Sequence, residues 1–405
     1  MKYWTGYITA AILAAIAWAL NQMGERFTVL VDMVYPYVTR TLQTMLAEWS
    51  GSLDFLLWQL IAVALVVIAI AFLVVIIIMR WNPIRWLGWV LAGCSFIYML
   101  HTLVFGLNYY AGSIADDVRL EMDDYIVEDL IDATKYYRNI ANALAVQMDR
   151  DETGSVDFSD FDTLAQQAGD GFRNLVYRDS YSVFAGSTAP VKKLGWADMY
   201  TSMGITGFTM GLTGEAAVNP QIPDVTLPFT MCHEMAHRMC IATEGDANFA
   251  AFLACQANSS LEFQYSAYFM AYRYCYNALV SANTTTAVTA AAQIVEEVSP
   301  QLQADMDHYS AFFASKQDEQ ATKLADTVND TYLKTSGDKD GIASYGNVVD
   351  LLVNWHFQKI VLPSITVEED PFDPLDESQV DLSGIVNAKE PVATEPPENE
   401  GGGVG

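Results

Sequence analysis

The sequence predicts a membrane-anchored α+β protein, in which three transmembrane helices precede a mostly helical domain with a small β-sheet. Three observations predict this fold class. The first 110 residues hold three long apolar stretches, the chain after Ile114 shows amphipathic helical periodicity, and residues 182–228 are rich in Gly, Thr and β-branched residues. A chain of 405 residues is long enough for a membrane region and one domain of ordinary size.

The three apolar stretches run over residues 3–23, 55–79 and 86–109, and the second contains an uninterrupted aliphatic run. A helix needs about 20 apolar residues to cross about 30 Å of hydrocarbon. A helix buried in a soluble core would show polar residues on one face, which the second stretch lacks. Residues 1–110 are therefore expected to form a membrane anchor of three transmembrane helices.

The short connections between these stretches predict the orientation in the membrane. Arg80 and Arg85 lie in the turn between the second and third stretches, and Lys2 precedes the first. Cytoplasmic loops carry an excess of Lys and Arg, so these residues are expected in the cytoplasm. Residues 24–54 then form an outer loop. We expect a multi-pass protein of the cell membrane whose domain is extracytoplasmic.

Residues 111–365 are expected to form this folded domain. Periodicity predicts helices over about 116–148, 228–279 with a break at 241–243, 290–329 and 344–359. A strand over 206–213 is predicted within the sheet region. Residues 366–405 are rich in Asp, Glu, Pro and Gly, and they are expected to form a disordered tail.

The charge of the domain excludes anionic partners. Of the 21 Lys+Arg and 49 Asp+Glu residues, five and four lie before Ala111, which leaves 16 basic against 45 acidic residues, a net charge of −29. Nucleic acid binding depends on neutralising phosphates, so DNA and RNA are excluded as partners. The five cysteines form no CxxC pair, and their odd number argues against a full disulfide framework. Cys255 and Cys275 could pair if their helices meet, but buried free thiols are the simpler interpretation.

The segment His233-Glu234-Met235-Ala236-His237 has the pattern of a catalytic metal site. Residues four apart lie on one face of a helix, so His233 and His237 can both reach one zinc ion. Glu234 would lie beside that ion, where it can act as a general base on a zinc-bound water. An unliganded pair of histidines and an acid would be costly among the apolar and small neighbours of the motif. We therefore predict His233 and His237 as zinc ligands and Glu234 as the catalytic residue.

A catalytic zinc usually has three protein ligands and one open position. Glu244 begins a segment typical of a new helix, and Thr243 with Asp246 has the pattern of a capping box that starts this helix. Glu244 and Asn248 would share a face, so Glu244 could bind zinc while Asn248 supports a neighbouring histidine. Asp246 is the alternative ligand, or a second supporting residue. Both acids would also be favoured at a helix start by the helix dipole, without any metal.

The residues around the motif resemble a family of bacterial membrane proteins, DUF3810, that is believed to be zincin-like. The resemblance lies in Phe-Thr-Met-Cys-His-Glu-Met-Ala-His, in Glu-x-x-Ala-Asn-Phe from Glu244 onward, and in the Gly-rich stretch at 204–219. It covers roughly residues 3–362. Glu-x-x-Ala-Asn is also similar to the third-ligand segment of gluzincin peptidases.

This resemblance implies a zincin-like, gluzincin-type metallopeptidase domain. It implies zinc on His233, His237 and Glu244, with Glu234 as the general base. In the family pattern a Gly follows the second histidine by three residues, whereas this chain has Cys240. That departure leaves open the geometry of the turn that leads to Glu244.

The zincin-like arrangement also predicts two further parts of a cleft. Zincins commonly line their cleft with an edge strand, so backbone groups near 207–211 would hold an extended peptide, with Glu215 and Asn219 orienting the segment. A purely structural hairpin is the alternative. A tetrahedral intermediate needs a second electrophile besides zinc. The candidates are Tyr265, Tyr268, Tyr272, His308 and His356, although a tyrosine stripe at helical spacing more often belongs to the core.

The acidic segment at 149–160 matches a calcium-binding EF-hand loop. The residues at loop positions 1, 3, 5, 9 and 12 are Asp149, Asp151, Thr153, Asp157 and Asp160. The last position usually holds a bidentate Glu, and a single unpaired loop is unusual. An acidic solvated turn is therefore the alternative.

Together these patterns predict a membrane-anchored zinc metallohydrolase that acts on a peptide or protein substrate, with Zn²⁺ as cofactor and Ca²⁺ as a candidate second ion. The alternative is a non-enzymatic membrane sensor or assembly protein with a structural or vestigial zinc site. Glu234 speaks against that alternative, because a structural site has no use for its carboxylate. A transporter is disfavoured because the apolar stretches lack intramembrane acids.

Overall fold

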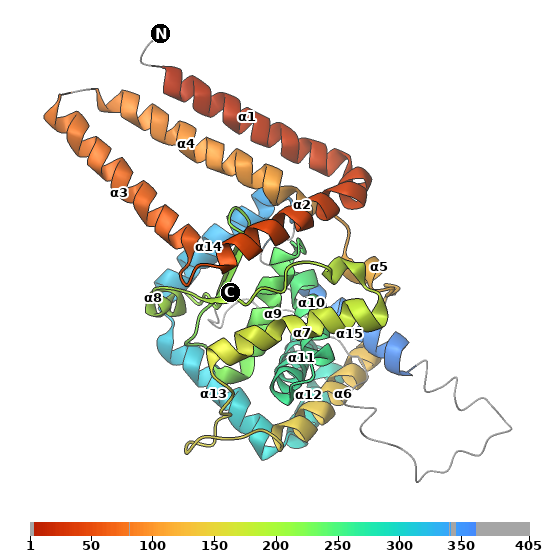
Figure 1. The fold of residues 1–405 in the computed structure, drawn as a ribbon. Coiled ribbons are helices and arrows are strands. Elements are labelled where there is room, and N and C mark those ends of the chain that lie inside the picture. The colour runs from red at the N-terminus through yellow and green to blue at the C-terminus, as the bar shows by residue number, and fades with distance from the viewer. Residues whose placement is uncertain (1–3, 81, 340, 342–345, 362–405) are drawn as a thin grey trace, which may run out of the picture.

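The structure is a computed structural model that describes residues 4–80, 82–339, 341 and 346–361. Within these ranges the chain is mostly helical and contains a three-stranded sheet, as the sequence predicts. Long apolar helices project from one side of a packed helical domain (Figure 1). The predicted tail at 366–405 lies outside the described residues.

Three helices of the described residues are long and apolar enough to cross a membrane. They are α1 (Thr5–Arg26), α3 (Leu57–Ile78) and α4 (Pro83–Val104), and they confirm the three predicted stretches. α1 and α4 pack side by side, and a Cβ atom at Gly6 would lie 2.6 Å from the backbone of Gly88, so only glycine allows this approach. Their orientation across a membrane stays a prediction.

The predicted outer loop at residues 24–54 is instead largely a helix, α2 (Thr28–Gly51). This helix runs across the domain at the base of the apolar helices (Figure 1). Arg40 is buried and donates from Nε to the carbonyl of Met239, 3.0 Å away. Gln43 donates from Nε2 to the carbonyl of Gly211 at 2.7 Å. These polar side chains bind carbonyl groups of the domain and not water. The segment is therefore as polar in composition as a solvent-exposed loop, although it is a helix.

The remaining helices form the domain, and each long predicted helical region is divided into shorter ones. They are the 3-10 helix η1 (Gly106–Tyr110), α5 (Ile114–Asp117), α6 (Val127–Ala145), α7 (Phe161–Asp179), η2 (Ser182–Phe184), α8 (Ala197–Ser202), η3 (Asp224–Thr226), α9 (Leu227–Arg238), α10 (Glu244–Ala257), α11 (Leu261–Ser281), α12 (Thr285–Glu296), α13 (Pro300–Lys316), α14 (Glu319–Ser336), α15 (Val348–His356) and the π-helical turn η5 (Phe357–Val361). The divisions follow local signals: Ser299 caps α13 just before Pro300, and Asp318 caps α14.

The sheet consists of β1 (Lys192–Lys193), β2 (Gly207–Met210) and β3 (Glu215–Val218), in the order β1-β3-β2. β3 is parallel to β1 and antiparallel to β2. The predicted strand at 206–213 is therefore present as the edge strand β2. It is shorter than predicted because the chain reverses at 211–214, where Gly214 donates to the carbonyl of Met210.

Glu215 and Asn219, which we expected to orient the edge strand, connect the sheet to helices. The Glu215 carboxylate accepts hydrogen bonds from the backbone N–H groups of Leu57 and Trp58, at 2.8 and 2.9 Å, and so caps the start of α3. Lys192 neutralises the same carboxylate at 2.8 Å. Asn219 donates to the hydroxyl of Thr201 in α8. The sheet is therefore fixed to the beginning of an apolar helix.

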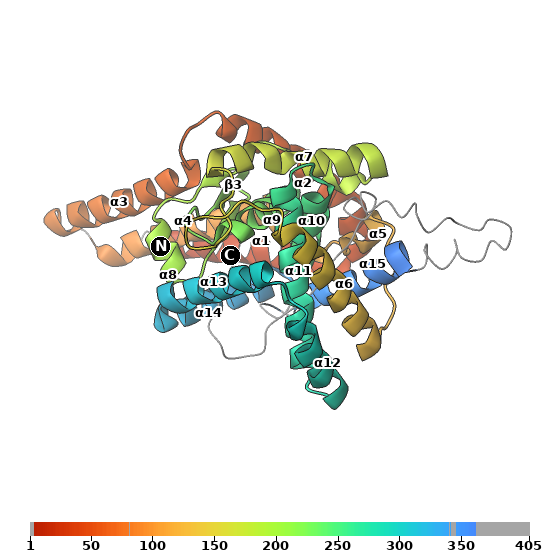
Figure 2. The ribbon, with the colours of Figure 1, turned by 90° about the horizontal axis from the view of Figure 1, so that it is seen from below.

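Helices α9 and α10 occupy the centre of the domain (Figures 1 and 2). Every residue of α9 is buried, as is every residue of α10 except the last. α7 and α11 pack on both helices. Polar side chains on α9 and α10 are thereby removed from water, so each needs a partner inside the protein.

Candidate metal centre

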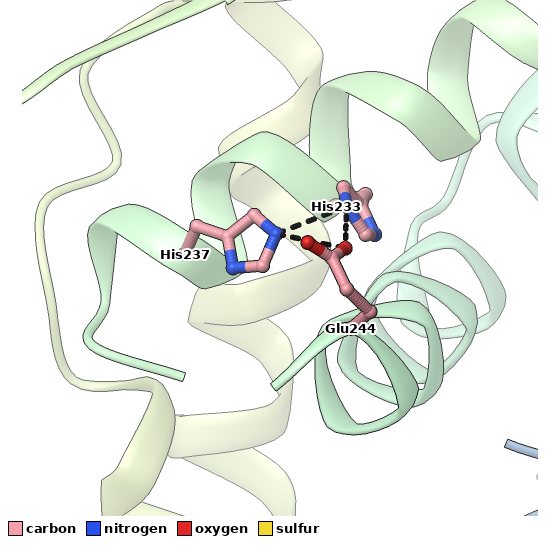
Figure 3. Close-up of side chains that lie close together, drawn as sticks. All are labelled: His233, His237 and Glu244. Atoms are coloured by element: carbon pink, nitrogen blue, oxygen red, sulfur yellow. Dashed lines mark hydrogen bonds and ion pairs between the residues drawn. The ribbon is translucent and has the colours of Figure 1, made fainter. Parts of the chain in front are cut away.

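The predicted histidine pair lies on α9, where one helical turn brings both imidazoles to the same face. His233 and His237 are buried, and their Nε2 atoms lie 3.1 Å apart. Oε2 of Glu244, at the start of α10, lies 3.2 Å from the first of these nitrogens and 3.3 Å from the second. Figure 3 shows the three side chains converging on one point. Among the described residues, this is the only group of three or more His, Cys, Asp or Glu side chains close enough to hold a metal ion.

The spacing of these atoms fits a zinc ion. Tetrahedral bonds of about 2.0–2.1 Å place neighbouring ligand atoms about 3.3 Å apart. Glu244 Oε2 is buried, and beyond its short distances to the two histidine nitrogens it has no hydrogen-bond partner. A carboxylate oxygen facing two ring nitrogens is the donor set that a zinc ion prefers. His233, His237 and Glu244 would therefore hold such an ion, whereas the predicted alternative Asp246 lies outside this group.

The turn between α9 and α10 places Glu244. The N–H of Cys240 donates to the carbonyl of His237, and the N–H of Ile241 donates to that of Ala236, which is the bond pattern of a Schellman motif. Cys240 occupies the left-handed position of this motif with φ 71°. Glycine favours that conformation. Cys240 thus adopts the backbone conformation that the glycine of the family pattern would have. The turn between α9 and α10 therefore has the same geometry as with glycine.

The same turn orients the second histidine. Nδ1 of His237 lies 2.9 Å from the carbonyl oxygen of Ile241. A carbonyl can only accept, so Nδ1 carries a proton and Nε2 is the ring nitrogen that would bind a metal ion. This is the usual support for a metal-binding histidine. Sequence reasoning missed it because the partner is a backbone atom.

The Glu234 side chain lies against the edge strand β2. The hydroxyl of Thr209 lies 2.6 Å from its Oε2 and 2.8 Å from its backbone carbonyl. A Cβ atom at Gly207 would overlap the Glu234 side chain, so only glycine leaves room for it. Burial raises the pKa of Glu234, and this is only partly opposed by the nearby histidines and the Thr209 hydroxyl. The carboxyl is therefore a stronger base than an exposed glutamate.

The charges of His237 and Glu244 depend on each other. Burial disfavours the charged form of His237, but the carboxylates of Glu244 and Glu234 and the Ile241 carbonyl together outweigh it and raise the His237 pKa to about 9. Burial likewise opposes ionisation of Glu244, and the two histidines overcome it and hold the Glu244 pKa well below its usual range. The surroundings thus favour a charged pair of His237 and Glu244, and a metal ion that binds there would displace a proton.

The two predicted supporting residues have different outcomes. The helix begins after Thr243, as expected, but no capping box forms, because the Thr243 hydroxyl bonds the Asp246 carboxylate at 2.8 Å and not a backbone group. Asp246 also accepts from the hydroxyl of Ser113 at 2.6 Å, which ties α10 to the segment before α5. The amide nitrogen of Asn248 and Nδ1 of His233 are both buried without a hydrogen-bond partner. Support of a histidine by Asn248 stays a prediction.

The candidates for a second electrophile have partners away from the cluster. Tyr265 bonds Asp305, Tyr268 accepts from Gln256, His308 bonds Ser155, and the rings of Tyr272 and His356 lie against Tyr276 and Tyr136. Two tyrosines that are not among these candidates interact electrostatically with Glu244. Burial raises the pKa values of Tyr274 and Tyr332, and the charge of Glu244 raises them further. Both therefore lie within electrostatic reach of Glu244.

The acidic loop at 149–160 is folded by its own hydrogen bonds. Asp151 Oδ1 accepts from the backbone N–H groups of Thr153 and Ser155 and from the Thr153 hydroxyl. Asp160 caps α7. Within the described residues, no three of the loop's acidic side chains approach closely enough to hold an ion. Calcium binding by Asp149, Asp151, Thr153, Asp157 and Asp160 stays a prediction.

All five cysteines are free thiols, and four of them are buried. Cys255 lies beside Cys232. Burial raises the pKa of the Cys255 thiol, and the neighbouring Cys232 raises it further. The disulfide between Cys255 and Cys275 that the sequence left open does not form, so the simpler interpretation holds.

Comparisons with known proteins extend over most of the chain. A family model described as "Protein of unknown function (DUF3810)" matches residues 31–353. The matched range begins within α2 and contains α3, α4, the sheet and all three residues of the cluster. No curated protein matches, and no solved structure matches.

Proposed function

The chain belongs to the DUF3810 family, whose description assigns no activity, and from its own residues we propose that it is a membrane-anchored, zinc-dependent peptidase. The proposal includes a zincin-like, gluzincin-type arrangement of the domain, with His233, His237 and Glu244 as zinc ligands and Glu234 as the catalytic base. It also includes an extracytoplasmic position for the domain in the cell membrane. Its substrate class is peptide or protein.

One observation carries this proposal. Three donor atoms that would suit a tetrahedral zinc site lie 3.1–3.3 Å apart, and the carboxylate next to His233 in sequence contacts β2, the edge strand of the sheet. A zinc ion bound there would polarise a substrate carbonyl and lower the pKa of water. Hydrolysis of peptide bonds is the reaction this arrangement most often serves, and that step is an analogy.

The chain's own residues supply the proton transfer. Thr209 holds Oε2 of Glu234, which leaves Oε1 pointing at β2 beside Gly207. Burial raises the pKa of the Glu234 carboxyl, so Oε1 is suited to take up a proton and later give it to a leaving amine. A side chain with an exposed carboxylate would hold that proton less well near neutral pH.

The alternative, a non-enzymatic protein with a structural zinc site, is favoured by one observation. His233, Glu234, His237 and Glu244 are each less than 10% exposed, so the site is closed. A structural site has all four positions occupied, whereas a catalytic site keeps one open for water or substrate. X-ray absorption spectroscopy of the zinc-loaded protein distinguishes these cases through the number of light-atom ligands and their response to a hydroxamate inhibitor.

The experiment that tests the proposal uses the full-length chain in detergent. Wild type, Glu234→Gln and the matched control Glu262→Gln are assayed for zinc content and for cleavage of a mixed-sequence peptide library. Glu262 lies on α11 and bonds Ser159, so its variant changes the same chemistry elsewhere. We expect zinc in all three and cleavage in all but Glu234→Gln. Zinc without cleavage in wild type, or equal cleavage in Glu234→Gln, would favour the non-enzymatic alternative.

A further inference from the structure

The outer edge of β2 is open in the described part of the chain. The backbone N–H of Asn219 donates to the carbonyl of Thr206, so residues 206 and 219 form a hydrogen-bonded pair. Antiparallel pairing alternates, and the peptide groups of Gly207 and Thr209 therefore face the open edge. These are the two residues whose side-chain face lies against Glu234. An extended peptide added to this edge would pass directly beside the catalytic carboxylate.

The opposite face of β2 and the turn that follows it contact the ends of two apolar helices. The ring of Phe208 lies 5.1 Å from that of Trp58, the second residue of α3. In the turn after the strand, a Cβ atom at Gly211 would lie 2.8 Å from Cβ of Phe105, the residue that follows α4. β2 and its turn therefore bridge the domain-side ends of α3 and α4. Figure 1 shows these two helices close together at the far end and separating toward the domain.

The length of α3 fixes the level of β2 relative to a bilayer. Its 22 residues span about 33 Å at 1.5 Å per residue, which matches the hydrocarbon thickness of about 30 Å. Leu57, whose N–H group is capped by Glu215, therefore lies where α3 enters the bilayer. Phe208 contacts the next residue, so β2 lies within one side-chain layer of the membrane boundary.

Exposed apolar side chains lie on β2 and on the segment around α8. Trp196 and Met199 are 56% and 47% exposed, next to or within α8, and Phe208 on β2 is 40% exposed. The segment that carries Trp196 and Met199 is attached to the start of α3, because Gln59 donates to the carbonyl of Gly195. Aromatic residues are enriched at membrane–water interfaces. This face of the domain is thus suited to lie in the headgroup layer and not in bulk water.

From this arrangement we infer that the substrate is itself anchored in the membrane, and that it is cleaved in an extended segment within a few residues of the bilayer. The inference rests on the proposed peptidase function. A segment emerging from the bilayer beside α3 and α4 reaches the open edge of β2 directly. Confinement to the same membrane raises its effective concentration, whereas a soluble protein would have to insert a loop between the domain and the lipid surface.

The first test compares substrates in one lipid nanodisc preparation of the full-length, zinc-loaded chain. Each probe carries a randomised eight-residue segment, placed 2 or 25 residues from a 20-residue Leu/Ala transmembrane helix, or supplied as a free peptide. We expect cleavage of the near segment at least tenfold faster than of the other two. Equal cleavage of all three would overturn the inference and leave the peptidase function standing. No cleavage of any probe would overturn the peptidase function, and the inference with it.

A second test measures the level of β2 without any activity. A nitroxide label is placed at Phe208→Cys in a Cys94→Ser background, because Cys94 is the exposed native thiol. Tyr177→Cys, at a site 92% exposed on α7, serves as the aqueous reference, and Leu65→Cys in the middle of α3 serves as the bilayer reference. We expect the accessibility of the Phe208 label to oxygen and to a nickel complex to lie between the two references. A label as accessible to nickel as the one at Tyr177 would overturn the inference.

Discussion

Replacing Gly207 by alanine should separate catalysis from metal binding. The three atoms nearest to the added Cβ all belong to Glu234, and the closest, Oε1, would lie 2.4 Å away where ordinary contacts begin at 3.4 Å. The carboxylate must therefore retreat by about 1 Å, and a misplacement of that size costs about 100-fold in rate. No zinc ligand is among the three atoms nearest to the added Cβ, so zinc binding should be unchanged.

The assay measures kcat on a library-derived peptide together with zinc per chain. Gly93→Ala is the matched control, because its Cβ would meet nothing within 4 Å. We expect kcat to fall about 100-fold in Gly207→Ala, with zinc retained, and to stay at the wild-type value in the control. Wild-type kcat in Gly207→Ala would refute the role of Glu234 as a base held against β2. Loss of zinc would refute the separation of the base from the metal ligands.

Three further changes test individual parts of the site. Thr209→Val removes a hydroxyl that lowers the Glu234 pKa, so the acidic limb of the pH profile of kcat/KM should move to higher pH. An acidic limb that does not move would argue against the hydrogen bond between Thr209 and Glu234. Asp246→Asn should lower the free energy of unfolding by about 1–3 kcal/mol through its lost hydrogen bonds, measured by denaturation in detergent, with zinc content unchanged. Cys240→Gly should be more stable than Cys240→Ala by about 1 kcal/mol, because alanine keeps a Cβ at φ 71°; equal stabilities would argue against the left-handed turn. Because the His237 pKa is raised to about 9 without metal, zinc affinity should rise with pH up to that value and zinc uptake at pH 7 should release a proton, as calorimetry in two buffers would measure.

Local patterns predicted those parts of the structure that depend on local interactions. Three apolar helices, the edge strand and the helix start after Thr243 follow from composition, periodicity and capping preferences. The side-by-side histidines follow from helical geometry alone. The helix start at Thr243 and the resemblance both favour Glu244 as the third ligand, and the turn at Cys240 brings it to the histidines.

The parts that sequence reasoning missed depend on contacts between distant segments. The sequence predicts a loop where α2 forms, because the residues that anchor this helix, Arg40 and Gln43, are polar, and only the folded domain supplies the carbonyls they bind. Thr209 lies 25 residues before Glu234, and nothing in its local sequence distinguishes it from other strand threonines. Asp246 has the spacing of a helix cap, but a hydroxyl from the segment before α5 competes for its carboxylate.

The zinc content of the full-length protein tests the central claim most directly. The chain is purified in detergent as wild type and as His233→Ala, with circular dichroism as the check on folding. We expect about one zinc ion per wild-type chain and none in the folded His233→Ala variant. A wild-type protein that binds no zinc even after loading, or a His233→Ala variant that retains it, would contradict the assignment of His233, His237 and Glu244 as a metal centre.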